Sequence, residues 1–178
     1  MAALQAGIDH GLTVIDTAEM YADGGAEEVV GQAIRGLRDR VVLVSKVYPW
    51  HAGKAAMHRA CENSLRRLQT DYLDMYLLHW RGDIPLQETV EAMEKLVAEG
   101  KIRRWGVSNL DTEDMQALWR TAGGECCATN QVLYHLASRG IEYDLLPWCQ
   151  QHSLPVMAYC PLAQAGRLRD GLFQHSDI

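Results

Sequence analysis

Short apolar segments alternate with amphipathic segments along nearly the whole chain. The apolar segments, rich in β-branched residues, are typical of buried strands and cover residues 12–15, 41–44, 72–78, 102–107, 128–132 and 155–159. Apolar residues recur at helical spacing in residues 2–10, 27–37, 54–68, 86–99, 111–120 and 143–152. A strand followed by a helix therefore recurs every ~24–32 residues, the size of a βαβ unit. No linker interrupts the pattern, so we expect a parallel sheet with right-handed crossovers in a single domain over residues 1–178.

Polar residues stand at the carboxyl end of each predicted strand. They are Asp16, Lys46, His79, Asn109, Gln131 and Tyr159. Ligands of parallel α/β proteins bind at these ends. Neighbouring strands lie ~4.8 Å apart, so a flat sheet of this size would spread the ends over ~24 Å, too far for one small substrate. Curling the sheet brings the ends around one mouth, which favours a (β/α) barrel over a doubly wound sheet. No GxGxxG sequence follows a strand, which also weakens a Rossmann interpretation.

Composition narrows the class of protein further. A chain of 178 residues, 48% hydrophobic, is ordinary for one globular domain. Its net charge of −6 argues against nucleic acid or an anionic membrane as the main partner, and no apolar run approaches the ~20 residues of a membrane span. Five cysteines without a CxxC pair indicate reduced thiols, so we expect a cytoplasmic protein. Seven histidines without HExxH or paired spacing argue against a metal site.

Residues 16–21 suggest acid chemistry. A carboxylate at the end of a buried strand, such as Asp16, needs a partner, and the phenol of Tyr21 gives up its proton near neutral pH only if a cation stabilises the phenolate. Lys46 can supply that cation while Asp16 pairs with it, and His79 can orient a carbonyl oxygen beside the phenol. Each residue also has a structural explanation: a capping aspartate, a surface tyrosine, a lysine reaching to solvent, a core histidine.

Longer motifs around these residues resemble those of one family. Residues 11–31 resemble the first signature of the aldo-keto reductases, residues 72–80 the strand that carries their histidine, and residues 101–109 the strand that reaches the nicotinamide. Residues 130–132 and 159–162 are similar to two later stretches of the family. The resemblance covers essentially the whole chain and is strongest to the bacterial branch that reduces small aldehydes such as methylglyoxal. It implies an aldo-keto reductase (β/α)₈ TIM barrel.

The resemblance also implies roles for individual residues. Tyr21 would donate the proton, supported by Asp16, Lys46 and His79. The residues that would bind the cofactor NADPH are Ser108, Asn109 and Gln131 at its carboxamide, Tyr159 against the nicotinamide ring, Cys160 near the pyrophosphate, and the next two residues, Pro161 and Leu162. Cys160 stands where a serine is usual, which weakens a side-chain hydrogen bond to the pyrophosphate and leaves backbone contacts.

Two tryptophans are candidates for the substrate pocket. Trp50 and Trp80 each follow a predicted strand end, next to Lys46 and His79. We expect both to line the pocket of a small aldehyde or ketone. The alternative is that they pack beneath loops.

The extent of the match raises a second functional hypothesis. A full barrel of this type takes ~250 residues, and this chain matches the family from its first helix to just after its seventh strand. We therefore expect a fragment or a truncated relative that lacks the first and eighth strands and the loop that grips the 2′-phosphate of NADPH. Such a chain would be either an NADPH-dependent carbonyl reductase or a non-catalytic binding module. We expect open edges at residues 12–15 and 155–159 to favour self-association, and discrimination against NADH to be poor.

Overall fold

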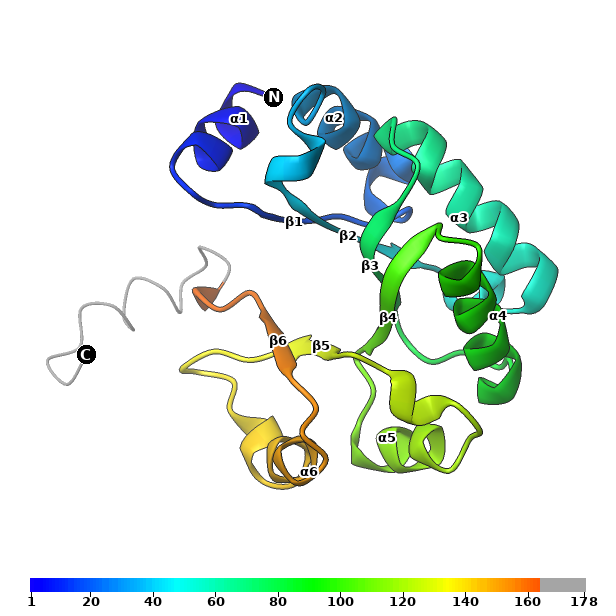
Figure 1. Cartoon of the computed structure of the whole chain (residues 1–178). Coiled ribbons are helices and arrows are strands. Elements are labelled where there is room, and N and C mark those ends of the chain that lie inside the picture. Colours follow the sequence, from blue (N-terminus) through cyan, green and yellow to red (C-terminus); the bar gives the residue numbers. More distant parts are fainter. Residues whose placement is uncertain (164–178) are drawn as a thin grey trace, which may run out of the picture.

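The computed structural model describes residues 1–163, and its centre is a parallel sheet of six strands (Figure 1). The strands are β1 (Val14–Asp16), β2 (Val42–Val47), β3 (Leu73–Leu78), β4 (Ile102–Ser108), β5 (Asn130–Leu133) and β6 (Val156–Tyr159). Each strand pairs in parallel with the next strand along the chain, so the spatial order equals the sequence order. This order confirms the expected series of βαβ units.

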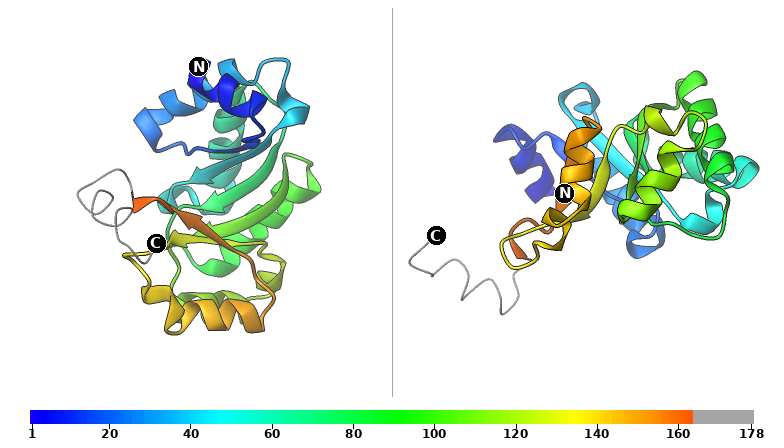
Figure 2. Two further views of the ribbon diagram at one scale, coloured as in Figure 1. Left: turned by 90° about the vertical axis from the view of Figure 1, so that its left-hand side faces the viewer. Right: turned by 90° about the horizontal axis from the view of Figure 1, so that it is seen from below.

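Helices surround the convex side of the curved sheet (Figures 1 and 2). The α-helices are α1 (Ala2–Asp9), α2 (Gly25–Ala33), α3 (Lys54–Leu68), α4 (Leu86–Ala98), α5 (Thr112–Trp119) and α6 (Leu145–Gln151). Short 3₁₀ helices lie between them: η1 (Tyr21–Gly24), η2 (Arg38–Arg40), η3 (Pro49–His51), η4 (Gly124–Cys126) and η5 (Gly140–Glu142). Within residues 1–163, no helix combines the length and the hydropathy needed to cross a bilayer.

The strands curl into a C-shaped part of a barrel, as Figure 1 shows in a view along the barrel axis. β4 and β5 approach so closely that a Cβ at Gly106 would lie 2.6 Å from the Thr129 carbonyl oxygen, which only glycine permits. The curl also brings Gln131 of β5 to Asp16 of β1, with 3.0 Å between Nε2 and Oδ1. A flat sheet could not make this contact, so the expectation of an incomplete (β/α)₈ barrel is confirmed.

Several element boundaries agree with the sequence pattern. α3 spans the predicted residues 54–68, and Gly11 follows α1 with a φ of +87°, the left-handed conformation of a C-terminal cap. Asp111, the first residue of the predicted helix 111–120, caps α5, since its Oδ1 accepts a hydrogen bond of 2.8 Å from the Asp114 amide.

Other predictions of local structure were wrong. The second helix ends at Ala33 instead of residue 37, because the chain turns through Gly36 with a φ of +75°. Tyr21 and Trp50, which lie outside every predicted helix and strand, belong to the 3₁₀ helices η1 and η3. The prediction of a buried first strand was also wrong: in β1 only Ile15 is buried, and Val14 is 58% exposed. The reason is that β1 has one neighbour, β2, among the described residues.

Candidate active site

The ends of β1 and β2 hold an ion pair in which Lys46 is buried and the Asp16 side chain is 35% exposed. Lys46 is 1% exposed, and its Nζ donates hydrogen bonds to Asp16 Oδ2 at 2.6 Å and to the Thr17 carbonyl oxygen at 2.9 Å. Burial of an ammonium group is costly unless it is paired and hydrogen-bonded. Asp16 therefore holds the Lys46 ammonium in place, as predicted from their positions at neighbouring strand ends.

Tyr21 lies at the start of η1, against the same ammonium group. Its hydroxyl oxygen is 3.3 Å from Lys46 Nζ, and the ammonium nitrogen lies 4.9 Å from the centre of the ring. An ammonium group can only donate, so the phenol oxygen accepts this hydrogen bond and the O–H hydrogen remains available to another acceptor. Tyr21 is 37% exposed, so that acceptor can approach from solvent.

His79 follows β3 and faces the edge of the Tyr21 ring, with 5.7 Å between ring centres. The residue is 7% exposed, and its Nδ1 has no hydrogen-bond partner among residues 1–163. A satisfied core histidine would have both nitrogens paired or solvated, so this geometry favours a functional role. Burial, together with the nearby Lys46 ammonium, lowers the pKa of His79 to about 4. At neutral pH the imidazole is therefore uncharged, with one N–H donor.

Polar groups at the ends of β4, β5 and β6 form a connected group beside Tyr21 and its supporting residues. Ser108 Oγ donates to the Gln131 carbonyl oxygen at 2.8 Å, and Asn109 Nδ2 donates to the His79 carbonyl oxygen at 3.0 Å. Tyr159 donates its hydroxyl to Asn109 Oδ1 at 3.0 Å. The structure thus brings together the residues to which the family resemblance gives carboxamide and ring binding.

The next residues of the chain follow directly from β6. Cys160 adopts a left-handed φ of +51°, and its carbonyl oxygen accepts a 2.9 Å hydrogen bond from the Ala163 amide, which closes a tight turn. Pro161 and Leu162 lie in this turn, and Leu162 is 66% exposed. The turn borders the mouth next to Tyr159, and its role at a pyrophosphate stays a prediction.

The two tryptophans lie together beside His79. Trp50 is 59% exposed and stacks on Tyr48, with 4.3 Å between ring centres and 20° between planes. The centre of the Trp80 ring lies 5.8 Å from that of Trp50 and 5.0 Å from that of His79. Both therefore lie near the strand ends, with Trp50 packed on another aromatic ring, and their role in a substrate pocket stays a prediction.

The sequence interpretation missed two residues that shape this side of the mouth. Tyr48 supports Trp50, and Glu19 connects the loop of Tyr21 to the loop of Trp50. Glu19 Oε1 accepts a 2.6 Å hydrogen bond from the Tyr48 amide and lies 3.1 Å from His51 Nδ1. The available signal was position, since Glu19 lies within the stretch that follows the first strand.

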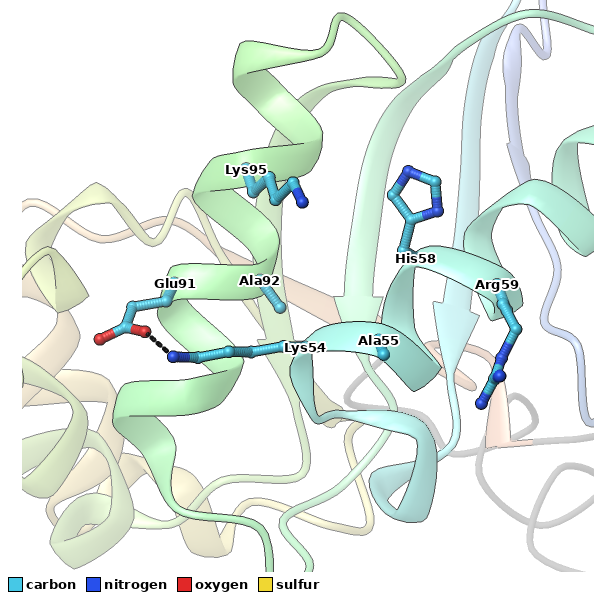
Figure 3. A pocket seen from close by; sticks show the side chains of 7 residues that line it. All are labelled: Lys54, Ala55, His58, Arg59, Glu91, Ala92 and Lys95. Carbon is cyan, nitrogen blue, oxygen red and sulfur yellow. Dashed lines mark ion pairs between the residues drawn. The ribbon is translucent and has the colours of Figure 1, made fainter.

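A hollow elsewhere on the surface does not belong to this site (Figure 3). It has a volume of about 620 Å³ and lies between α3 and α4, in the outer layer of helices, not at the strand ends. Lys54 and Glu91, which line it, form an ion pair with 2.7 Å between Nζ and Oε2, so each charge is balanced by the other. Residues 1–163 hold no group of metal-ligating side chains.

The amino-acid sequence was compared with family models and with known proteins, and both comparisons point to one family. The model of the aldo/keto reductase family matches residues 1–175. The chain is 72% identical over 178 residues to methylglyoxal reductase YeaE of Escherichia coli, covering 100% of this chain and 63% of that protein. It is 39% identical to aldo-keto reductase YhdN of Bacillus subtilis, covering 90% of this chain and 51% of that protein. The chain thus spans less than two thirds of the length of these relatives.

Solved structures show the same fold. An aldo/keto reductase from Klebsiella pneumoniae in complex with NADP and acetate is 98% identical to the chain, with a TM-score of 0.95 over 99% of this chain and 62% of that one. A structure of an aldo-keto reductase from the same organism in complex with NADPH matches to the same extent. Both the sequence and the arrangement of strands agree, and the chain belongs to the aldo/keto reductase family.

Proposed function

We propose that the protein reduces small aldehydes and ketones such as methylglyoxal to alcohols with NADPH, and that Tyr21 is the proton donor. The observation that carries the proposal is that one buried ammonium group, Lys46 Nζ, contacts both the Asp16 carboxylate and the Tyr21 hydroxyl. The related E. coli protein is a methylglyoxal reductase, and the similar Klebsiella structures contain NADP and NADPH. Both facts support the same substrate class and cofactor here.

The residues at the mouth fit the proposed cofactor. Ser108, Asn109 and Gln131 present hydroxyl and amide groups, the donors and acceptors that a carboxamide requires. Tyr159 stands beside them with its hydroxyl tethered to Asn109, so its ring is held in one orientation for stacking. Bound NADPH supplies the hydride that the carbonyl carbon accepts.

The chain's own residues then manage the charge and the proton. As the carbonyl oxygen becomes negative, the Tyr21 O–H donates its proton to that oxygen. The phenolate left behind is stabilised by Lys46, 3.3 Å away, which Asp16 keeps in place from its other side. Neutral His79 donates an N–H to the same carbonyl oxygen and so fixes its orientation.

The test is NADPH consumption with methylglyoxal in the wild type and in Tyr21→Phe. We expect kcat to fall by about 100-fold or more, because removing a general acid typically costs that much. The matched control is Tyr143→Phe, since Tyr143 is 92% exposed and lies between η5 and α6, not at a strand end. Equal turnover by wild type and Tyr21→Phe would show that Tyr21 is not the acid.

A fluorescence titration with NADPH addresses the alternative of a non-catalytic module. Saturable binding by a protein that also turns over supports the reductase. Turnover that is absent for every carbonyl tested, together with no binding, would favour the non-catalytic module. The cytoplasmic location stays a prediction.

A further inference from the structure

The turn that carries Tyr21 adopts an unfavourable backbone conformation. Ala22 and Asp23 both have a φ of +52°, and Gly24 follows with a φ of +90°. Successive left-handed residues are rare, and only glycine adopts that region without steric cost. Such a turn persists only where the surrounding structure holds it. The question is therefore which groups hold the turn that presents the proton donor.

A buried carboxylate lies directly behind this turn. Glu27, in the first turn of α2, is 0% exposed. Its Oε1 accepts a 2.5 Å hydrogen bond from Ser45 Oγ, and its Oε2 accepts one of 2.6 Å from Arg67 Nε. Ser45 immediately precedes Lys46 on β2, so Glu27 connects the helix that follows the Tyr21 turn to the strand that carries the ammonium group.

Arg67, which reaches Glu27 from α3, also covers the turn itself. A Cβ added at Gly24 would lie 2.6 Å from both Cδ and Nε of Arg67. The arginine side chain thus occupies the space above Gly24, while Glu27 and Ser64 Oγ hold its guanidinium group. Because of these bonds, Arg67 cannot move aside without breaking its ion pair with the fully buried Glu27 carboxylate.

We propose that the Glu27–Arg67 ion pair is a positioning device that holds the Tyr21 turn at the right distance from Lys46. The Arg67 side chain packs against Gly24. Glu27 holds Arg67 by the ion pair and links α2 to β2 through its hydrogen bond with Ser45. Neither residue contacts the proposed reacting groups, so both act through Tyr21. This inference rests on the proposed role of Tyr21 as proton donor.

The test uses the double variant Glu27→Gln/Arg67→Met, which removes both charges together and so leaves no unpaired buried charge. Arg66→Met is the matched control, because Arg66 is the exposed neighbour on the same helix. We expect kcat with methylglyoxal to fall about tenfold or more in the double variant, since small displacements of a catalytic group cost up to about 100-fold. KM for NADPH should change by less than about twofold, because the cofactor residues lie on β4 to β6. Arg67→Lys, which keeps the charge, should give an intermediate kcat.

A spectroscopic measurement separates this inference from the proposed function. In protein labelled with 3-fluorotyrosine, the ¹⁹F resonance of Tyr21 is assigned by its loss in Tyr21→Phe. The Tyr21 resonance should shift or broaden in the double variant and stay in place in Arg66→Met, whether or not the protein turns over. If circular dichroism shows that the double variant is unfolded, Arg67→Lys takes its place in both measurements. An unmoved resonance with unchanged kcat would overturn the positioning role and leave the reductase proposal intact.

Discussion

Gln131 on β5 donates its side-chain amide to the Asp16 carboxylate at the end of β1, with 3.0 Å between Nε2 and Oδ1. The other carboxylate oxygen of Asp16 accepts from Lys46 at 2.6 Å. One aspartate therefore connects the residues proposed to bind the cofactor with the residues proposed to supply the proton. The connection spans the two sides of the barrel mouth and links the first and fifth strands.

The first prediction tests this connection with Gln131→Leu. The variant removes a hydrogen bond to a charged group that is 35% exposed, so we expect a loss of about 1 kcal/mol in the free energy of unfolding. NADPH affinity should fall as well, because the same amide is proposed to bind the carboxamide. Urea unfolding and cofactor titration measure the two effects. Gln150→Leu, at an exposed position on α6, is the control. An unchanged free energy of unfolding would mean that the Gln131–Asp16 hydrogen bond does not stabilise the fold.

The second prediction concerns the pH dependence of stability. The pKa of His79 is lowered to about 4, below its ordinary value of 6.5, so between these pH values the unfolded chain binds more protons at this residue than the folded chain. The contribution of neutral His79 to stability is therefore complete above about pH 6.5 and is lost as the pH falls toward 4. Melting temperatures from pH 4.5 to 7.5 should show the wild type losing stability relative to His79→Gln as the pH falls. Parallel curves would contradict the lowered pKa.

Much of the framework follows from periodicity. The spacing of apolar residues in 54–68 is enough to place α3, because the helix follows one face along its whole length. The positions of the strand ends also follow from the sequence pattern. Because the strands are parallel, Asp16, Lys46 and His79 must lie at the same, carboxyl-terminal edge of the sheet. These three residues can therefore be grouped from the amino-acid sequence alone, and Tyr21 follows Asp16 by five residues.

Other features depend on tertiary contacts that periodicity does not encode. The exposure of Val14 follows from β1 having one neighbour among residues 1–163, although its apolar, β-branched segment resembles a buried strand. The left-handed turn after Tyr21 contains Ala22 and Asp23, which do not signal positive φ. Likewise, the pairing of Glu27 with Arg67 joins two helices at a distance of 40 residues, and nothing in the sequence singles out these two among its 23 acidic and 17 basic residues.

The third prediction concerns substrate preference. Trp50 is 59% exposed, and its ring contacts the rings of Tyr48 and Trp80, the second of which lies beside His79. Trp50→Ala should therefore change the ratio of kcat/KM between methylglyoxal and a nitrobenzaldehyde by about 10-fold or more, because an exposed aromatic face contacts the larger ring. The Kd for NADPH should stay within about twofold. A larger effect on NADPH than on the aldehyde ratio would place Trp50 outside the substrate pocket.

The last prediction concerns association through the sheet edges. Among residues 1–163, β1 and β6 each pair with one neighbour, and unpaired strand edges readily pair with another chain. Val14 lies two residues before Asp16, so it shares the inner face of the curved sheet and leaves an apolar side chain 58% exposed there. We expect the 178-residue chain to sediment as dimers or larger species at micromolar concentration.

Val14→Lys should shift this distribution toward monomer, because a charge at a strand edge opposes pairing with another chain. Val29→Lys, on the exposed side of α2, should leave the distribution unchanged. A wild-type chain that sediments as a monomer and melts cooperatively would show that these edges do not drive association.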